Sequence, residues 1–377
     1  MVFQQLSQLS LENQEERLEV SPITPKLNRL GGSSATGSPL SSRNPQEITP
    51  TDSPRRHRRR KEPASFNILV IGFCGSGKTS FVEYLSEQLN TVKDQQHSMI
   101  KEEEKQDYLD MGFTCYCAET EINGERIAVT LWDSRGFGTS RDYEIVNLQM
   151  DEIILFMESK FENTFSEETK VIRPHKHIDT HIHCVLYLID STSSYLYNDV
   201  SLDSLDISII QRLGRYSTVI PVISKVDTCT KRRIGNMKLA WRKEFEKSEI
   251  KIFEFLSNNE SLDDVSTCES THSREKDENY DDIYNLLPFS CIIPDRAQII
   301  PFSFEKTMKF DIYREYPWGK ADPLDEKHCD FSKLKEMVLG EWRNEIRDFS
   351  KEVLYENWRT DRLEKLRNLS SKVENRK

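Results

Sequence analysis

The sequence predicts an α/β fold in which a mainly parallel sheet is flanked by helices. Three observations indicate this class: short apolar runs recur along the chain, segments with helical apolar spacing lie between them, and a glycine-rich motif joins the first run to the first helical segment. The apolar runs, which we expect to be strands, are 66–72, 126–133, 182–190, 218–224 and 288–293. The segments that we expect to be helices are 79–89, 143–159, 203–213 and 331–370.

Each element follows from its own pattern. The run 66–72 (F-N-I-L-V-I-G) is short, apolar and ended by glycine, which is typical of a buried strand. The apolar residues of 79–89 recur at helical spacing. The longest apolar run, 182–189, falls short of the roughly 18 residues that a membrane span needs, so it is interpreted as a buried strand. The segment 331–370 is expected to form one or two long helices.

The composition predicts which parts stay outside the fold. Residues 1–65 are rich in Ser-Pro and Thr-Pro, and 257–284 is acidic and serine-rich, so both are expected to be disordered. The net charge of −11 argues against nucleic-acid binding by bulk charge, although 55–61 (R-R-H-R-R-R-K) carries six positive charges. Eight cysteines without a C-x-x-C pair, in a chain with no predicted export signal, indicate reduced thiols and a cytoplasmic location.

The strongest motif is G-F-C-G-S-G-K-T at 72–79, which matches G-x-x-x-x-G-K-[ST]. Glycines let backbone amides approach a phosphate chain, Lys78 would reach the β and γ phosphates, and the Thr79 hydroxyl would ligate Mg²⁺. The alternative is an accidental glycine-rich turn, but the motif lies between a strand and a helix, as phosphate binding requires. The candidate phosphate-binding residues are Gly72, Gly75, Ser76, Gly77, Lys78, Thr79 and Ser80.

Two further motifs follow predicted strands. In D-S-R-G (133–136), Asp133 would hold Mg²⁺ through water and the Gly136 amide would contact a γ phosphate. In S-K-V-D (224–227), Asp227 would accept two hydrogen bonds from the guanine edge while Lys225 packs over the base, so the motif favours GTP over ATP. The alternative for Asp227 is a surface carboxylate at a strand end. Together the motifs predict a Ras-like P-loop GTPase fold.

Hydrolysis lacks its usual water-positioning residue. No glutamine follows Gly136, because Phe137 stands there. Turnover is therefore expected to be slow or absent.

Several segments outside these motifs resemble the septin family. Three segments resemble the septin unique element: Y-P-W-G at 316–319, H-C-D-F at 328–331 and L-Y-E-N-W-R-T-D-R-L at 354–363. A fourth segment, D-T-H-I-H-C-V-L-Y at 179–187, resembles the strand that enters the septin core. The resemblance covers about 55–365. It implies a GTP-binding domain at 66–310, a helical septin unique element at 311–365 and a short tail at 366–377.

The resemblance also implies a function. Septins bind GTP or GDP and assemble with other septin subunits into hetero-oligomeric rods and filaments, as cytoskeletal scaffolds in cytokinesis or in specialised morphogenesis such as sporulation. By resemblance, Arg314 stacks on guanine, Trp318 lies at the nucleotide-side interface and His183 is an interface histidine. The run 55–61 resembles the stretch that binds phosphoinositides, which implies a peripheral location at an anionic membrane; a nuclear-localisation signal or mere solubility are its alternatives.

This chain departs from the family pattern in several places. Septins usually have D-T-P-G and A-K-A-D where this chain has D-S-R-G and S-K-V-D, and Ile293 and Pro294 stand where the family has glycine. The switch threonine aligns near Gly112, with Thr114 close by, and we do not expect this sequence to form the long C-terminal coiled coil of many septins. Two other functions therefore stay open: a nucleotide-free scaffold and a GTPase that cycles as a switch.

Four histidines form two H-x-H motifs between residues 175 and 183. Alternate residues of a strand share a face, so two of them could ligate Zn²⁺ with help from a partner subunit; interface and loop histidines are the alternative. Cys115 and Cys117 likewise share one strand face, without the basic neighbours that a redox role needs. The histidines are His175, His177, His181 and His183.

Overall fold

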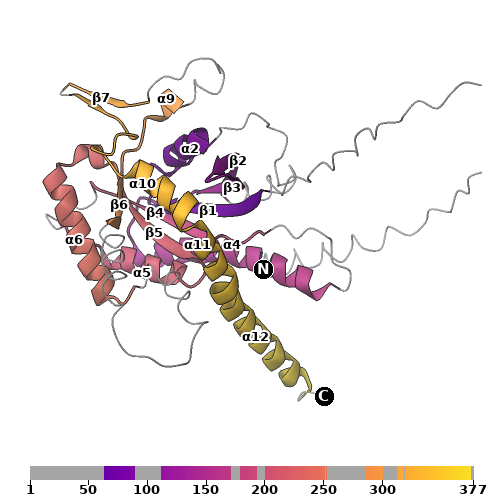
Figure 1. Cartoon of the computed structure of the whole chain (residues 1–377). Helices are drawn as coiled ribbons and strands as arrows, with labels where there is room; N and C mark the ends of the chain where they lie inside the picture. Colours follow the sequence, from indigo (N-terminus) through magenta and orange to yellow (C-terminus); the bar gives the residue numbers. More distant parts are fainter. Residues whose placement is uncertain are drawn as a thin grey trace, which may run out of the picture. The chain divides into compact units, whose positions relative to one another are not determined.

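A computed structural model shows the arrangement of the chain (Figure 1). It describes residues 63–89, 112–170, 179–192, 200–250, 252, 286–299, 312–317 and 319–374. The chain divides into two units, 1–59 and 60–377, and every described residue belongs to the second. The basic run 55–61, the acidic insertion 257–284 and nearly all of the N-terminal region predicted to be disordered lie outside the described residues.

The sheet has six strands in the order β2-β3-β1-β4-β5-β6. All neighbours pair in parallel except β2 and β3, which form an antiparallel hairpin at one edge, so the predicted fold class is confirmed. The strands are β1 (Ala64–Gly72), β2 (Phe113–Ile122), β3 (Glu125–Ser134), β4 (Cys184–Asp190), β5 (Thr218–Ser224) and β6 (Phe289–Cys291). The first strand therefore begins two residues before the predicted boundary.

Helices follow the strands, as the alternating pattern predicts. They are α2 (Lys78–Leu89), α4 (Tyr143–Thr169), α5 (Ser204–Leu213), α6 (Lys231–Lys247) and the short α9 (Arg296–Ile299). The helix predicted at 143–159 continues to Thr169, because Lys160, Phe161 and Thr164 are still buried against the core. No helix among the described residues is both long and apolar enough to cross a membrane.

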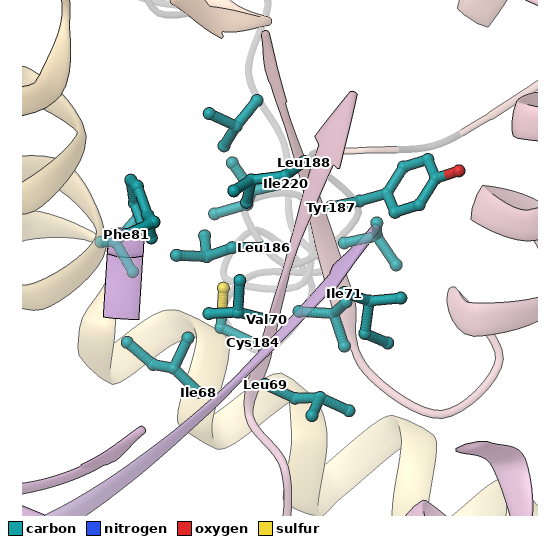
Figure 2. Close-up of a cluster of buried hydrophobic side chains, with 14 of the residues drawn as sticks. Ile68, Leu69, Val70, Ile71, Phe81, Cys184, Leu186, Tyr187, Leu188 and Ile220 are labelled. Atoms are coloured by element: carbon teal, nitrogen blue, oxygen red, sulfur yellow. The ribbon is translucent and has the colours of Figure 1, made fainter. Parts of the chain in front are cut away.

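The core lies on both faces of the two central strands. Because successive side chains of a strand point to opposite faces, Ile68 and Val70 of β1 lie on the side of Phe81 from α2, whereas Ile71 lies on the other side (Figure 2). On β4, Leu186 and Tyr187 divide between the two faces in the same way (Figure 2). Burial on both faces explains why these strands are almost wholly apolar.

The C-terminal helical segment is less regular than predicted. Its apolar stripe is buried, but two π-helical stretches, Met337–Glu341 and Ser350–Tyr355, interrupt it. The α-helical pieces are α10 (Phe331–Glu336), α11 (Arg343–Phe349) and α12 (Glu356–Glu374). Before them, β7 (Arg314–Tyr316) and β8 (Gly319–Ala321) form a separate two-stranded hairpin. This hairpin contributes directly to the site described next.

Candidate functional site

The glycine-rich motif forms the loop between β1 and α2. Gly75 and Gly77 adopt positive φ angles of 81° and 92°, which favour glycine. The Lys78 ammonium reaches back across the loop and donates to the carbonyl of Phe73 at 2.9 Å. Burial lowers the pKa of Lys78, and the nearby Asp133 opposes that shift. The loop thus holds a cation beside the exposed N-terminus of α2.

The loop after β3 packs directly on the phosphate loop. The Phe137 amide donates to the Gly72 carbonyl at 3.1 Å, and the Cys74 amide donates to the Phe137 carbonyl at 2.7 Å. This approach is so close that a Cβ on Gly136 would lie 2.2 Å from the Gly72 carbonyl oxygen, and a Cβ on Gly72 would lie 2.4 Å from the Leu188 carbonyl oxygen. The two motifs are therefore one structural unit.

Asp133 and Thr79 meet although they are far apart in the sequence. The Thr79 hydroxyl donates to Asp133 Oδ2 at 2.7 Å, while Asp133 Oδ1 is buried and accepts no hydrogen bond from the described residues. Burial raises the pKa of Asp133, and the Thr79 hydrogen bond and the Lys78 charge counteract the rise. An unpartnered buried carboxylate oxygen beside a hydroxyl is a donor set that fits Mg²⁺.

These residues line an open cleft of about 510 Å³. It gathers most of the predicted phosphate-binding residues, together with Asp133 and with residues from the ends of β2 and β3. Gly112 and Thr114, which align with the family's switch region, are among them. The lining is Cys74, Gly75, Gly77, Lys78, Thr79, Ser80, Gly112, Thr114, Asp133, Ser134 and Arg135. Three predicted phosphate-contact residues, Gly72, Ser76 and Gly136, are not part of this lining, and the Ser76 side chain is buried.

A second group of predicted residues lies at the end of β5. The Asp227 side chain is fully buried, because Arg314 donates to its Oδ2 at 2.7 Å and the Tyr316 hydroxyl donates to the same oxygen. Asp227 Oδ1 accepts no hydrogen bond from the described residues. Burial and the contact with Asp227 raise the pKa of Tyr316 to about 12, so the phenol remains a donor. Tyr316, which the sequence analysis missed, therefore covers this carboxylate together with Arg314.

Lys225 is held in place by its own partner. Its ammonium forms an ion pair with Asp190 Oδ2 at 2.8 Å, and its backbone is left-handed, with φ 56°. The Ser191 hydroxyl donates to the Lys225 carbonyl at 3.0 Å. The ends of β4 and β5 thus fix the S-K-V-D turn, and the role of Asp190 was not foreseen.

The segment after β6 connects the two groups. Ile293 packs against the phosphate loop, since its side chain lies 3.0 Å from where a Cβ on Gly77 would be. Two residues on, Asp295 Oδ1 accepts from Arg314 at 3.2 Å. A side chain at the family's glycine position therefore touches the phosphate loop.

The predicted interface role of His183 is wrong. Its side chain is wholly buried inside this chain, where Nδ1 accepts from the Asn67 amide at 2.9 Å. The other ring nitrogen, Nε2, therefore carries the hydrogen and donates to Asp179 Oδ2 at 3.1 Å. Burial alone would raise the pKa of Asp179, but the interactions with His183 hold it well below its usual value. Both ring nitrogens have partners, so His183 can neither bind Zn²⁺ nor contact another subunit.

Other predicted residues have no described position. Trp318, His175, His177 and the run 55–61 lie outside the described residues. Within the described part of the chain, no cluster of three or more histidine, cysteine or acidic side chains is placed to hold a metal ion. Cys115 and Cys117 lie on β2, as predicted, and neither forms a disulfide.

Comparisons with known proteins identify related sequences. A family model described as Septin matches residues 62–372. Septation protein 7 of Candida albicans is 27% identical over 348 residues, which cover 81% of this chain and 49% of the relative. Cell division control protein 11 of Saccharomyces cerevisiae is 26% identical over 311 residues, which cover 82% of this chain and 69% of the relative. This chain spans about half the length of the Candida relative.

One solved structure shares the fold. The crystal structure of a septin GTPase domain from Chlamydomonas reinhardtii matches with a TM-score of 0.51 and 18% identity, covering 79% of this chain and 99% of that chain. At this identity the likeness shows the fold alone.

Proposed function

Because the chain belongs to the septin family, we propose that it binds guanine nucleotide and assembles with other septin subunits into hetero-oligomeric rods and filaments. The observation that carries this proposal is the cleft that brings Lys78, Thr79 and Asp133 together. The related proteins are named for septation and cell division. The proposed role is accordingly a scaffold in cytokinesis or in a specialised morphogenesis such as sporulation.

The phosphate end of the nucleotide would lie in the cleft. The loop amides near Gly75 and Gly77 and the Lys78 ammonium supply donors for phosphate oxygens. Thr79 and Asp133 would hold Mg²⁺, which supplies positive charge to the phosphates when bound. The Cβ distances at Gly72 and Gly136 support the close packing of the two loops that form this cleft, because both positions leave room only for hydrogen.

The base end would be recognised by Asp227. Its unpartnered Oδ1 needs a donor, and the guanine edge carries N–H donors. Arg314 contacts the carboxylate, and Lys225 precedes Asp227 by two residues in the same turn. The second oxygen is already engaged by Arg314 and Tyr316, so base binding requires the hairpin β7–β8 to shift.

In the proposed mechanism, the chain acts by keeping a nucleotide bound rather than by hydrolysing it. Phe137 stands where a water-positioning glutamine would be, and it is buried, with its ring against Phe73. Hydrolysis is therefore at most slow, which disfavours a cycling switch. The second candidate function is a nucleotide-free scaffold, and the covered Asp227 carboxylate is the observation that favours it.

The first experiment is to identify the nucleotide released when the purified chain is denatured. GTP without GDP would support a binding septin that does not hydrolyse, and GDP would show that hydrolysis occurs. A chain that carries no nucleotide, even when purified with co-expressed septin partners, would contradict nucleotide binding and favour the nucleotide-free scaffold.

Asp227→Asn should convert the base preference from guanine to xanthine. A carboxylate only accepts hydrogen bonds, whereas an amide presents one acceptor and one donor, which matches the carbonyl and N–H of xanthine. We expect the affinity for GDP to fall by roughly 10- to 100-fold and that for XDP to rise, as measured by competition with a fluorescent nucleotide. Asp151→Asn, on the exposed surface of α4, is the control. Unchanged GDP affinity in Asp227→Asn would show that this residue does not recognise the base.

We also propose that the run 55–61 holds the assembled filament at an anionic membrane. Each basic residue near such a surface contributes about 1 kcal/mol, and filament avidity multiplies the effect. Replacing the six basic residues with glutamine should abolish co-sedimentation with vesicles that contain phosphoinositide, while assembly in solution persists. Replacing Lys231 and Arg232 on α6 is the control, and equal loss in both variants would contradict a specific role for 55–61.

A further inference from the structure

Arg135 lies in the proposed phosphate cleft, although no nucleotide motif requires an arginine there. It follows Asp133 by two residues and lines the cleft together with Lys78 and Thr79. Its backbone amide donates to the Gly112 carbonyl at 2.9 Å, which anchors the residue to the start of β2. The position of its Cα beside the cleft is therefore set by the sheet.

The Arg135 side chain extends over Gly112. A Cβ on Gly112 would lie 3.5 Å from Arg135 Cβ, 3.6 Å from Nε and 3.9 Å from Cζ. These are ordinary van der Waals distances, and the position favours glycine because its φ is positive, at 84°. The guanidinium therefore lies close to Gly112, beside the ends of β2 and β3.

The guanidinium is available to a ligand. Arg135 is exposed, and no carboxylate among the described residues forms an ion pair with it. Lys78, by contrast, is buried and donates to a backbone carbonyl of its own loop. The described lining of the cleft thus carries two cations, Lys78 and Arg135, and one carboxylate, Asp133. The two cations come from different loops, the β1–α2 loop and the loop after β3.

We propose that Arg135 is a second phosphate-binding cation, which contacts the terminal phosphate and makes this chain prefer a nucleoside triphosphate to a diphosphate. The inference rests on the proposed function, since it concerns the same cleft. An arginine fork donates two hydrogen bonds to one phosphate, whereas the proline of the usual septin motif D-T-P-G has no donor. We therefore expect this preference for a triphosphate in this chain and not in septins that carry the usual motif D-T-P-G.

The test compares the affinities of the full chain for a non-hydrolysable GTP analogue and for GDP, measured by fluorescence titration in the presence of Mg²⁺. Arg135→Ala should weaken binding of the triphosphate analogue about tenfold and that of GDP less than about twofold. Arg135→Lys keeps the charge without the fork and should give an intermediate ratio. Arg232→Ala, on the exposed surface of α6, should leave both affinities unchanged.

The outcomes distinguish this inference from the proposed function. Unchanged affinities for both nucleotides in Arg135→Ala would overturn the inference and leave nucleotide binding intact. Equal weakening of both nucleotides would also overturn it, because Arg135 would then only shape the cleft. A wild-type chain that binds neither nucleotide would overturn the proposed function and the inference together. Because Arg135 is exposed, a melting curve that matches the wild type verifies that the variant folds.

Discussion

Lys78→Met should lower the affinity for guanine nucleotide by roughly 10- to 100-fold, the value of one strong charge-assisted hydrogen bond to phosphate. Lys78 supplies the buried cation of the cleft, and methionine fills the same volume without a donor. Because burial lowers the pKa of Lys78, the fold holds this charge at a cost, and the variant should be at least as stable as the wild type without ligand. A loss of binding can therefore be separated from a loss of folding.

The same variant tests whether nucleotide organises assembly. We expect less nucleotide in the purified protein and, in parallel, less complex with co-expressed septin partners, as measured by size-exclusion chromatography with light scattering. Lys231→Met, at the exposed start of α6, is the matched control and should change neither. If Lys78→Met loses its nucleotide and still assembles fully, occupancy of the cleft is not what prepares the chain for its partners.

Gly136→Ala should destabilise the protein by about 2–4 kcal/mol, because two effects add. The residue has a φ of 71°, where an L side chain is strained. Its Cβ would lie 2.2 Å from the Gly72 carbonyl oxygen and 2.6 Å from Lys78 Cε. The carbonyl cannot move away freely, since it accepts the Phe137 amide. The substitution must therefore separate the loop after β3 from the phosphate loop.

Chemical denaturation of the two glycine variants in parallel measures this effect. Gly235→Ala, inside α6, has nothing within 4 Å of the added Cβ and should stabilise the protein by about 0.5–1 kcal/mol. Opposite signs for the same chemical change would show that contact at Gly136, and not glycine replacement in general, is responsible. A Gly136→Ala variant as stable as the wild type would mean that the two loops do not pack as described.

The central strands could be predicted because their sequence pattern has a single physical explanation. Runs such as 66–72 and 182–190 are apolar at nearly every position, and only burial on both faces of a parallel sheet suits such a run. Helix α6 was missed because its sequence is largely basic and polar. Its buried residues Met237, Trp241 and Phe245 recur every fourth position, which is a narrow stripe among many charges.

The turn of the edge hairpin carries a recognisable sequence signal. Asn123 and Gly124 join β2 to β3, both with positive φ, and Asn-Gly is the dipeptide that such tight turns favour. Strand β2 is only partly buried, so its apolar residues are too sparse to identify it alone.

Some residues of the candidate site could likewise be predicted from the sequence, and others could not. The spacing within 72–79 predicted a local loop. Thr79 and Asp133 were each predicted to hold Mg²⁺, and the structure places the two side chains in contact. The partners of Asp227 and Lys225 depended on side-chain geometry that no motif encodes, so Tyr316 and Asp190 were not found. His183 was misassigned because a likeness in sequence does not report which face of the chain a side chain occupies.

The covered carboxylate of Asp227 makes base recognition and the position of hairpin β7–β8 one coupled equilibrium. A guanine base would need both carboxylate oxygens, and Arg314 and Tyr316 already occupy Oδ2, so the hairpin would have to be arranged differently when guanine is bound. Coupling between two binding sites is reciprocal. A protein that binds the shifted hairpin would therefore raise the affinity for nucleotide, and bound nucleotide would raise the affinity for that protein by the same factor. A septin neighbour that contacts β7–β8 would then act as an allosteric effector of nucleotide retention, with no direct contact to the ligand.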